Sequence, residues 1–139
     1  MKRITLLLIA TIVLLGANSA FAQDDKEITP EEYAAKQVKS LTSKLQLSES
    51  QEFYVDSILT TNYVGLKNQI DDMQRSGMQD PENYRRCSEM WQDKTIAALK
   101  KVLDEQQFIK YLKHIGKGKD YKKGKDGKYY LKSELKKQK

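Results

Sequence analysis

Four helix-start signals constrain the fold of this chain more than any other feature of its sequence. In each signal a Ser, Thr or Asp precedes residues that favour a first helical turn, so its side-chain oxygen can accept from a free backbone N–H. A Glu or Gln three residues later can bond back to the capping residue, and Pro is favoured at the first helical position. The signals are Thr29-Pro30-Glu31-Glu32, Ser48-Glu49-Ser50-Gln51, Asp80-Pro81-Glu82-Asn83 and Asp104-Glu105-Gln106-Gln107. Four caps predict four helices.

Apolar residues recur every three or four positions after these starts, as on the buried side of a helix. The predicted stripes are Ala34, Val38, Leu41 and Leu45; Val55, Leu59, Tyr63, Leu66, Ile70 and Met73; Tyr84, Cys87, Trp91, Ala98 and Val102; and Phe108, Tyr111, Leu112 and Ile115. Alternation typical of strands is nearly absent between residues 28 and 115. Gly77 interrupts the pattern shortly before Pro81, which predicts a turn between antiparallel second and third helices. We therefore predict an all-α fold, a four-helix elongated hairpin bundle.

Gly65 lies inside the second predicted helix, where glycine costs up to about 1 kcal/mol relative to alanine. Two explanations are open. Another helix approaches closely at this position, which we favour, or the glycine is a functional hinge.

Residues 1–22 have the pattern of a signal peptide. Lys2 and Arg3 precede an apolar run, Ala20-Phe21-Ala22 fits the cleavage position, and acidic residues follow. An uncleaved anchor is the alternative, although the run is short for a membrane span. No cysteine follows the run to accept a lipid, so we expect a secreted chain in the periplasm of a Gram-negative bacterium.

The formal charge of +6 is unevenly distributed. Residues 23–115 hold 13 basic and 16 acidic side chains, whereas residues 116–139 hold ten lysines and three acids. We predict a helical domain over residues 29–115 and a disordered, flexible lysine-rich tail over residues 116–139. A domain of this size buries only about 60% of its surface, so we expect a homodimer or an open binding surface.

Two of the helix starts carry a family resemblance. Leu47-Ser48-Glu49-Ser50-Gln51 and Leu103-Asp104-Glu105-Gln106-Gln107 match the pattern Leu-Thr-x-x-Gln, with serine or aspartate in place of threonine. In an exported helical chain this pair resembles the Spy and CpxP family of periplasmic stress proteins. The resemblance implies a four-helix hairpin that dimerises into a cradle and holds unfolded or partly folded proteins without ATP. Some members of that family instead act on an envelope-stress sensor kinase.

Candidate client-binding residues gather around the predicted hairpin turn. They are Met73, Arg75, Met78, Tyr84, Arg85, Arg86, Met90 and Trp91. Methionine adapts to varied partners, and arginine and tryptophan are enriched where binding energy concentrates. The alternative is that these residues only close the hairpin tip, with Arg85 and Arg86 solvated.

Cys87 and His114 are the only cysteine and histidine of the chain. Cys87 is either a buried core thiol or, in an oxidising compartment, an intermolecular disulfide. One cysteine and one histidine make a poor ligand set, so we expect no metal and no cofactor. No Ser/His/Asp order, glycine-rich phosphate loop or Cys-x-x-Cys occurs, so we do not expect an enzyme.

These observations lead to two hypotheses about function. The first is a periplasmic ATP-independent holding chaperone or stress-response protein that binds unfolded or partly folded envelope proteins. The second is an envelope adaptor that docks a sensor-kinase domain, while the basic tail binds anionic lipid or saccharide. The charge pattern does not indicate a specific nucleic-acid partner.

Overall fold

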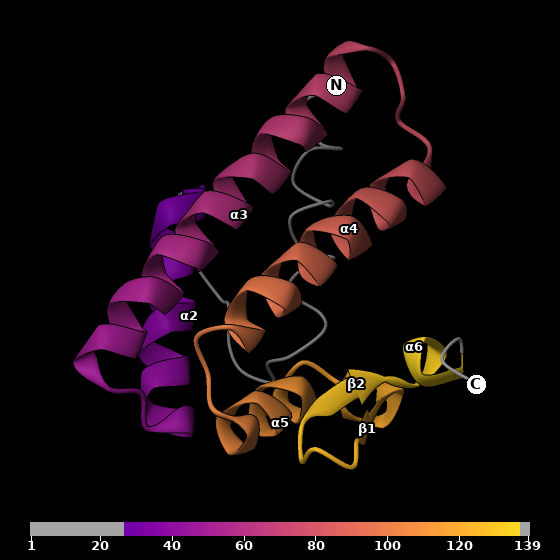
Figure 1. The fold of residues 1–139 in the computed structure, drawn as a ribbon. Coiled ribbons are helices and arrows are strands. Elements are labelled where there is room, and N and C mark those ends of the chain that lie inside the picture. The colour runs from indigo at the N-terminus through magenta and orange to yellow at the C-terminus, as the bar shows by residue number, and fades with distance from the viewer. Residues whose placement is uncertain (1–26, 137–139) are drawn as a thin grey trace. The chain divides into compact units, whose positions relative to one another are not determined.

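The computed structural model describes residues 27–136 (Figure 1). The predicted signal peptide, residues 1–22, lies outside these residues. The described chain divides into two compact units, a helical unit of residues 27–108 and a C-terminal unit of residues 109–136. None of the helices in the described part combines the length and apolar character that crossing a membrane requires.

Each of the four long helices begins directly after a predicted cap. They are α2 (Pro30–Leu45), α3 (Glu49–Arg75), α4 (Pro81–Lys100) and α5 (Glu105–His114). Thr29 Oγ1 accepts from the backbone N–H of Glu32 at 3.2 Å, and Asp80 Oδ1 accepts from that of Glu82 at 3.2 Å. The predicted four helices and the mostly helical fold are thus confirmed.

The core of the helical unit forms where α2 and α4 pack on α3 (Figure 1). The predicted stripe of α2 is fully buried, and α3 buries Val55, Leu59, Leu66 and Met73. Tyr63 of α3 is half-buried, and its ring meets that of Tyr33 edge-on with centroids 4.8 Å apart. These helices therefore use the apolar faces that the sequence predicts.

The buried side of α4 differs from the predicted stripe. Tyr84 and Cys87 are buried as expected, but Trp91, Ala98 and Val102 are only half-buried. Ile96 and Leu99 are buried instead. Thr95 interrupts the predicted stripe with a polar group, and its hydroxyl donates to the Trp91 carbonyl at 2.9 Å and accepts from Asn62 of α3 at 2.8 Å.

Gly65 marks a close approach of α3 and α4, which is the explanation that we favoured. A Cβ atom at this position would lie 2.2 Å from Cη2 of Trp91. The wide indole therefore occupies the space that a side chain on α3 would need.

Two glutamines join the ends of the helices in an arrangement that we call the glutamine clasp, Gln51 of α3 and Gln107 of α5. Gln51 Nε2 donates to Gln107 Oε1 at 2.7 Å, and Gln107 Nε2 donates to Gln51 Oε1 at 3.1 Å. Each Nε2 also donates to a backbone carbonyl, Gln51 to Val102 at 3.1 Å and Gln107 to Leu45 at 3.2 Å.

Each clasp glutamine also completes a capping box. Gln51 Oε1 accepts from the N–H of Ser48 at 3.1 Å, and Gln107 Oε1 accepts from the N–H of Asp104 at 3.1 Å. The sequence predicted both boxes but not the pairing between them. The pairing links the ends of α2 and α4 to the starts of α3 and α5.

The C-terminal unit contains a β-hairpin where we predicted a flexible tail. After α5 come η1 (Gly118–Asp120), β1 (Tyr121–Lys123), β2 (Tyr129–Leu131) and the short α6 (Lys132–Lys136). The strands are antiparallel, with Lys122 opposite Tyr130 and Lys123 opposite Tyr129.

The hairpin turn explains the difference from the prediction. Gly127 has a φ of +83°, a left-handed conformation that glycine adopts without steric cost. Asp126 accepts from the Lys128 N–H at 3.1 Å and from the Tyr130 hydroxyl. Asp-Gly between two short runs is a hairpin signal, which the high lysine content of the segment obscured.

Candidate functional site

The residues predicted to bind clients are divided between the core and the surface. Met73 and Tyr84 are each 7% exposed and belong to the interface of α3 and α4. Their positions on the apolar stripes account for this burial. In this structure, neither side chain is available to a partner.

Trp91 is half-buried and held on two sides. Its indole Nε1 donates to Gln69 Oε1 of α3 at 2.7 Å. The ammonium of Lys94 lies 4.1 Å from the centre of its ring. Trp91 therefore acts mainly as a contact between helices, with part of its ring still open to solvent.

The three predicted arginines are exposed and bonded to acids on their own helices. Arg85 pairs with Glu82 and Glu89, each at 2.6 Å, and Arg86 pairs with Glu82 at 3.1 Å. Hydrogen bonds from Arg85 and Arg86 lower the pKa of Glu82 to about 2. These pairs reduce the free positive charge that the arginines present.

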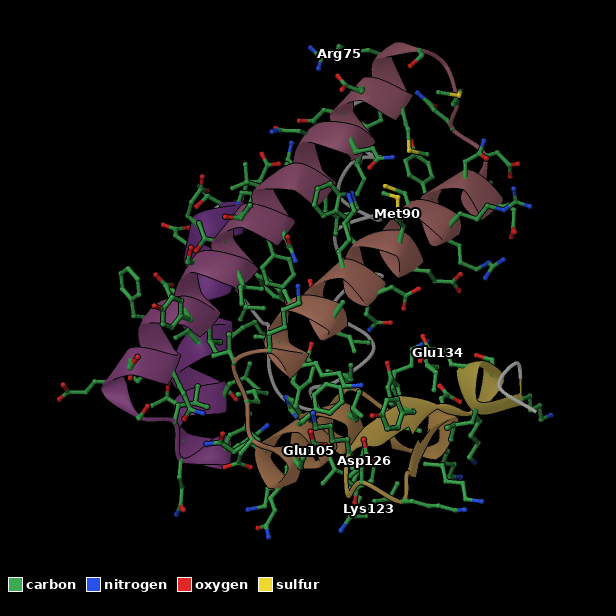
Figure 2. All side chains as sticks on the ribbon, viewed as in Figure 1. Arg75, Met90, Glu105, Lys123, Asp126 and Glu134 are labelled. Atoms are coloured by element: carbon green, nitrogen blue, oxygen red, sulfur yellow. The ribbon has the colours of Figure 1, made fainter. Side chains whose placement is uncertain are left out.

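Arg75 bonds to Asp72 at the end of α3 (Figure 2). A shallow surface hollow beside it is lined by Asp71, Gln74 and Arg75. Its lining is polar, so it does not suit an apolar ligand. This end of α3 therefore presents charged and amide groups around the exposed loop.

Met78 and Met90 are the predicted binding residues that remain apolar and accessible. Met78 is 50% exposed in the loop between α3 and α4, and Met90 of α4 is 38% exposed (Figure 2). The predicted residues thus lie on α3, α4 and the loop between them, but only part of the set is on the surface.

Sequence reasoning missed the two most exposed aromatic residues. Phe53 is 70% and Tyr54 is 53% exposed near the start of α3. Their rings meet edge-on, with centroids 5.6 Å apart. The available signal was that neither residue falls on the stripe of Val55 and Leu59, so a helix that buries this stripe turns both rings outward.

Acidic side chains surround this aromatic pair. Glu49, Glu52 and Asp56 are exposed in the same turns of α3, and no lysine or arginine occurs between residues 45 and 66. We call Phe53, Tyr54 and these three acids the aromatic patch. It combines apolar surface with negative charge.

The C-terminal unit has the opposite charge. Residues 109–136 contain ten lysines and three acids. The hairpin places lysines and tyrosines in cross-strand pairs, with Lys123 at the end of β1 and Asp126 in the turn (Figure 2). The hydrogen bond from Tyr130 lowers the pKa of Asp126, so this carboxylate stays charged while it holds the turn.

The single cysteine lies in the core. Cys87 is 5% exposed, and burial raises the pKa of its thiol. His114 is half-buried in the last turn of α5. Among residues 27–136, no group of three or more His, Cys, Asp and Glu side chains is placed to hold a metal ion.

No family model, curated protein or solved structure matches this chain. The resemblance to the Spy and CpxP family therefore rests on the two pentapeptides. The structure places them at the starts of α3 and α5, where their glutamines form the clasp.

Proposed function

We propose that this protein is an ATP-independent holding chaperone or stress-response protein that binds unfolded or partly folded proteins in the periplasm. One observation carries the proposal. Four large apolar side chains, Phe53, Tyr54, Met78 and Met90, are exposed on a helical unit whose core is complete without them. Contiguous exposed apolar side chains, such as the touching pair Phe53 and Tyr54, are typical of protein-binding surfaces.

The mechanism would be weak and reversible capture. The flexible methionines adapt to different client side chains, and the aromatic rings offer a large contact area. Neighbouring charged residues attract client segments of opposite charge, an effect that salt screens. Such binding needs no nucleotide. A homodimer, which we also propose, would place two sets of these side chains on one particle.

An aggregation assay tests this function. A chemically unfolded client is diluted into buffer of low ionic strength with an equimolar amount of the mature protein, and light scattering is followed. We expect suppression of aggregation, and we expect weaker suppression after Phe53→Ser, Tyr54→Ser, Met78→Ser and Met90→Ser are combined. Ser57→Ala with Thr61→Ala, on exposed positions of α3, is the control. Absence of any suppression by the unaltered protein would overturn the proposal.

The C-terminal unit favours a second candidate function, the envelope adaptor. Its hairpin gives the lysines a fixed arrangement beside tyrosines, a combination suited to an anionic lipid surface. In that role the helical unit would dock a partner such as a sensor-kinase domain.

Vesicle sedimentation separates the adaptor from the chaperone. We expect the protein to sediment with vesicles that contain anionic lipid and not with neutral vesicles. Lys122→Glu with Lys123→Glu should abolish this association, whereas Lys39→Glu with Lys101→Glu, the same charge change on the helical unit, should not. Equal losses from both pairs would show that only net charge matters and would argue against a hairpin site.

A further inference from the structure

We propose that the aromatic patch of α3 is a docking site for a lysine- or arginine-rich segment of an unfolded protein. The inference rests on the proposed function, because the segment belongs to a client. It adds the chemical class of client and the surface that recognises it.

The two aromatic rings are free to bind because the fold does not use them. Val55 and Leu59 of the same helix are 1% and 2% exposed and fill the core, whereas Phe53 is 70% exposed. Aromatic side chains bury about 150–250 Å² each when they are covered, so this pair offers a large contact area. Although the two rings touch edge-on, Phe53 and Tyr54 both remain mostly exposed.

Charge decides which ligand fits. Glu49 and Asp56 lie one turn before and one turn after Phe53, on the same face of α3, Glu52 lies in the same turns, and the next basic residue of α3 is Lys67. Two copies that met through this patch would bring six acids together without a base, which is unfavourable. A basic segment would instead find carboxylates for its charges and aromatic faces for its ammonium or guanidinium groups.

The helical unit already uses contacts of the same kind. The ammonium of Lys94 lies 4.1 Å from the ring centre of Trp91, and that of Lys100 lies 5.8 Å from the ring centre of Phe108. The exposed rings of the patch offer the same interaction to an external cation.

The start of α3 does not present an anion site. The Ser48 side chain accepts from the N–H of Gln51 at 3.2 Å, and Gln51 Oε1 accepts from the N–H of Ser48. Glu49 and Glu52 lie in the first turn of α3, where negative side chains complement the positive end of the helix dipole. The surface therefore attracts cations.

Peptide binding tests the proposal directly. The probes are two labelled synthetic peptides of alternating sequence, one of lysine and leucine and one of glutamate and leucine. Fluorescence anisotropy at low ionic strength should show binding of the lysine peptide that depends on the aromatic patch, whereas binding of the glutamate peptide to the lysine-rich C-terminal unit should not depend on it. Phe53→Ser with Tyr54→Ser should weaken lysine-peptide binding by about tenfold. Each of the two exposed rings contributes about 0.5–1 kcal/mol when it contacts a cation, and about 1.4 kcal/mol corresponds to a factor of ten. Circular dichroism checks that the variants remain folded.

Two further variants set the controls. Glu49→Gln with Glu52→Gln and Asp56→Asn should weaken the binding and flatten its dependence on salt, because the charges that salt screens are gone. Ala35→Ser with Ala97→Ser, on exposed positions of α2 and α4, should leave lysine-peptide binding unchanged. No binding of the lysine peptide, or no effect of the Phe53 and Tyr54 changes on its binding, would overturn the proposal.

The failure of the site and the failure of the function can be distinguished. If the lysine peptide binds through the patch but no client aggregation is suppressed, the chaperone function fails and the docking site stands. If suppression is normal after the patch is altered, the site fails and the function stands. Sedimentation of the protein alone adds one outcome. If the protein self-associates and the patch substitutions abolish this self-association, a second copy of the chain occupies the patch. The proposal that a client segment binds there would then be overturned.

Discussion

Trp91 fits against α3 because residue 65 has no side chain. The indole covers the backbone of Gly65 and reaches Gln69, one turn further along α3. The close contact with Trp91 thus explains why a helix-weakening glycine occurs at this position. The sequence favoured a close approach but did not identify the partner, because the register between two helices is not encoded in either stripe alone.

Gly65→Ala should destabilise the protein, although alanine is normally the better helix former by up to about 1 kcal/mol. The new methyl group would overlap the Trp91 ring, and overpacking of this kind costs about 1–3 kcal/mol. Urea unfolding followed by circular dichroism measures the change. Gly65→Ala combined with Trp91→Leu should recover much of the loss, and a stabilised single variant would show that the indole moves aside easily.

Cys87 should react slowly with a thiol reagent in the folded protein. Burial limits access and raises the thiol pKa, which lowers the fraction of reactive thiolate. The rate of reaction with Ellman's reagent should rise sharply in denaturant. A fast reaction of the native protein, or a disulfide-linked dimer on a non-reducing gel, would support the intermolecular disulfide instead.

At the residue level, the sequence indicated which apolar residues lie near the hairpin turn better than it indicated which of them are exposed. Met73, Tyr84 and Met90 are all apolar residues near the hairpin turn, yet only Met90 lies on the surface. Helical spacing separates the first two from the third once the buried face is known. Phe53 was missed because the prediction was based on clusters of methionine and arginine, and this ring lies at the other end of α3.

At the level of helices, the glutamine clasp explains why two capping boxes have similar sequences. In each glutamine, Oε1 accepts from the backbone N–H of its own capping residue, and Nε2 donates to Oε1 of the other glutamine. Both positions therefore need a carboxamide, which can donate and accept. Glutamate could not donate, and a shorter asparagine would reach less far. The pairing could not be predicted because it joins residues 56 positions apart.

Replacement of either clasp glutamine by alanine should destabilise the protein by about 1–3 kcal/mol, because polar groups of its partners lose their hydrogen bonds. The double variant should lose less than the sum of the two, with a coupling of about 0.5–3 kcal/mol. Chemical unfolding of the four proteins gives this cycle. Gln106→Ala, an exposed neighbour in the first turn of α5, is the control; additive effects would deny the coupling.

The first turns of α4 should show a pH effect centred on Glu82. Its pKa in the folded chain is about 2, lowered by Arg85 and Arg86 from an ordinary value of 4.5. The stabilisation is therefore present above pH 4.5 and is lost as the pH falls toward 2. NMR titration of the Glu82 carboxyl measures the shift, which Arg85→Ala with Arg86→Ala should largely remove. High salt should reduce it, since the pairs are exposed.

Helix boundaries were predictable here because caps are local signals. The hairpin of the C-terminal unit depends on a local signal too, Asp126-Gly127, but composition suggested disorder. Lysine, glycine and tyrosine bury little, so the strands hold through the turn and the cross-strand pairs. A composition rich in lysine and glycine indicates that a segment has little apolar core, but it does not exclude a local turn such as Asp126-Gly127.

At the level of the whole molecule, the two units carry opposite charge. Residues 27–108 have ten basic and 14 acidic side chains, whereas residues 109–136 have ten lysines and three acids. The total of +6 for the chain conceals this separation. A molecule with separated charges attracts its own copies at low ionic strength even when its net charge would repel them.

The chain without residues 1–22 should therefore become more soluble as salt is added, up to moderate concentrations. Static light scattering gives the second virial coefficient, which we expect to rise with added NaCl as the Debye length falls to about 8 Å at 0.15 M ionic strength. Lys122→Glu with Lys123→Glu and Lys125→Glu should weaken the dependence. A coefficient that falls steadily with salt would indicate simple net-charge repulsion.

The glutamine clasp also determines where the chain tolerates new length. The clasp fixes the register between α3 and α4 near the start of α3. The exposed loop of residues 76–80, at the opposite end of the two helices, therefore does not have to set this register. At 1.5 Å per residue, α3 carries this loop about 40 Å from the helix start. Each doubling of a flexible loop costs only about 0.6 kcal/mol. The loop is therefore the natural insertion point for a fluorescent reporter or an affinity tag that leaves the rest of the helical unit unchanged.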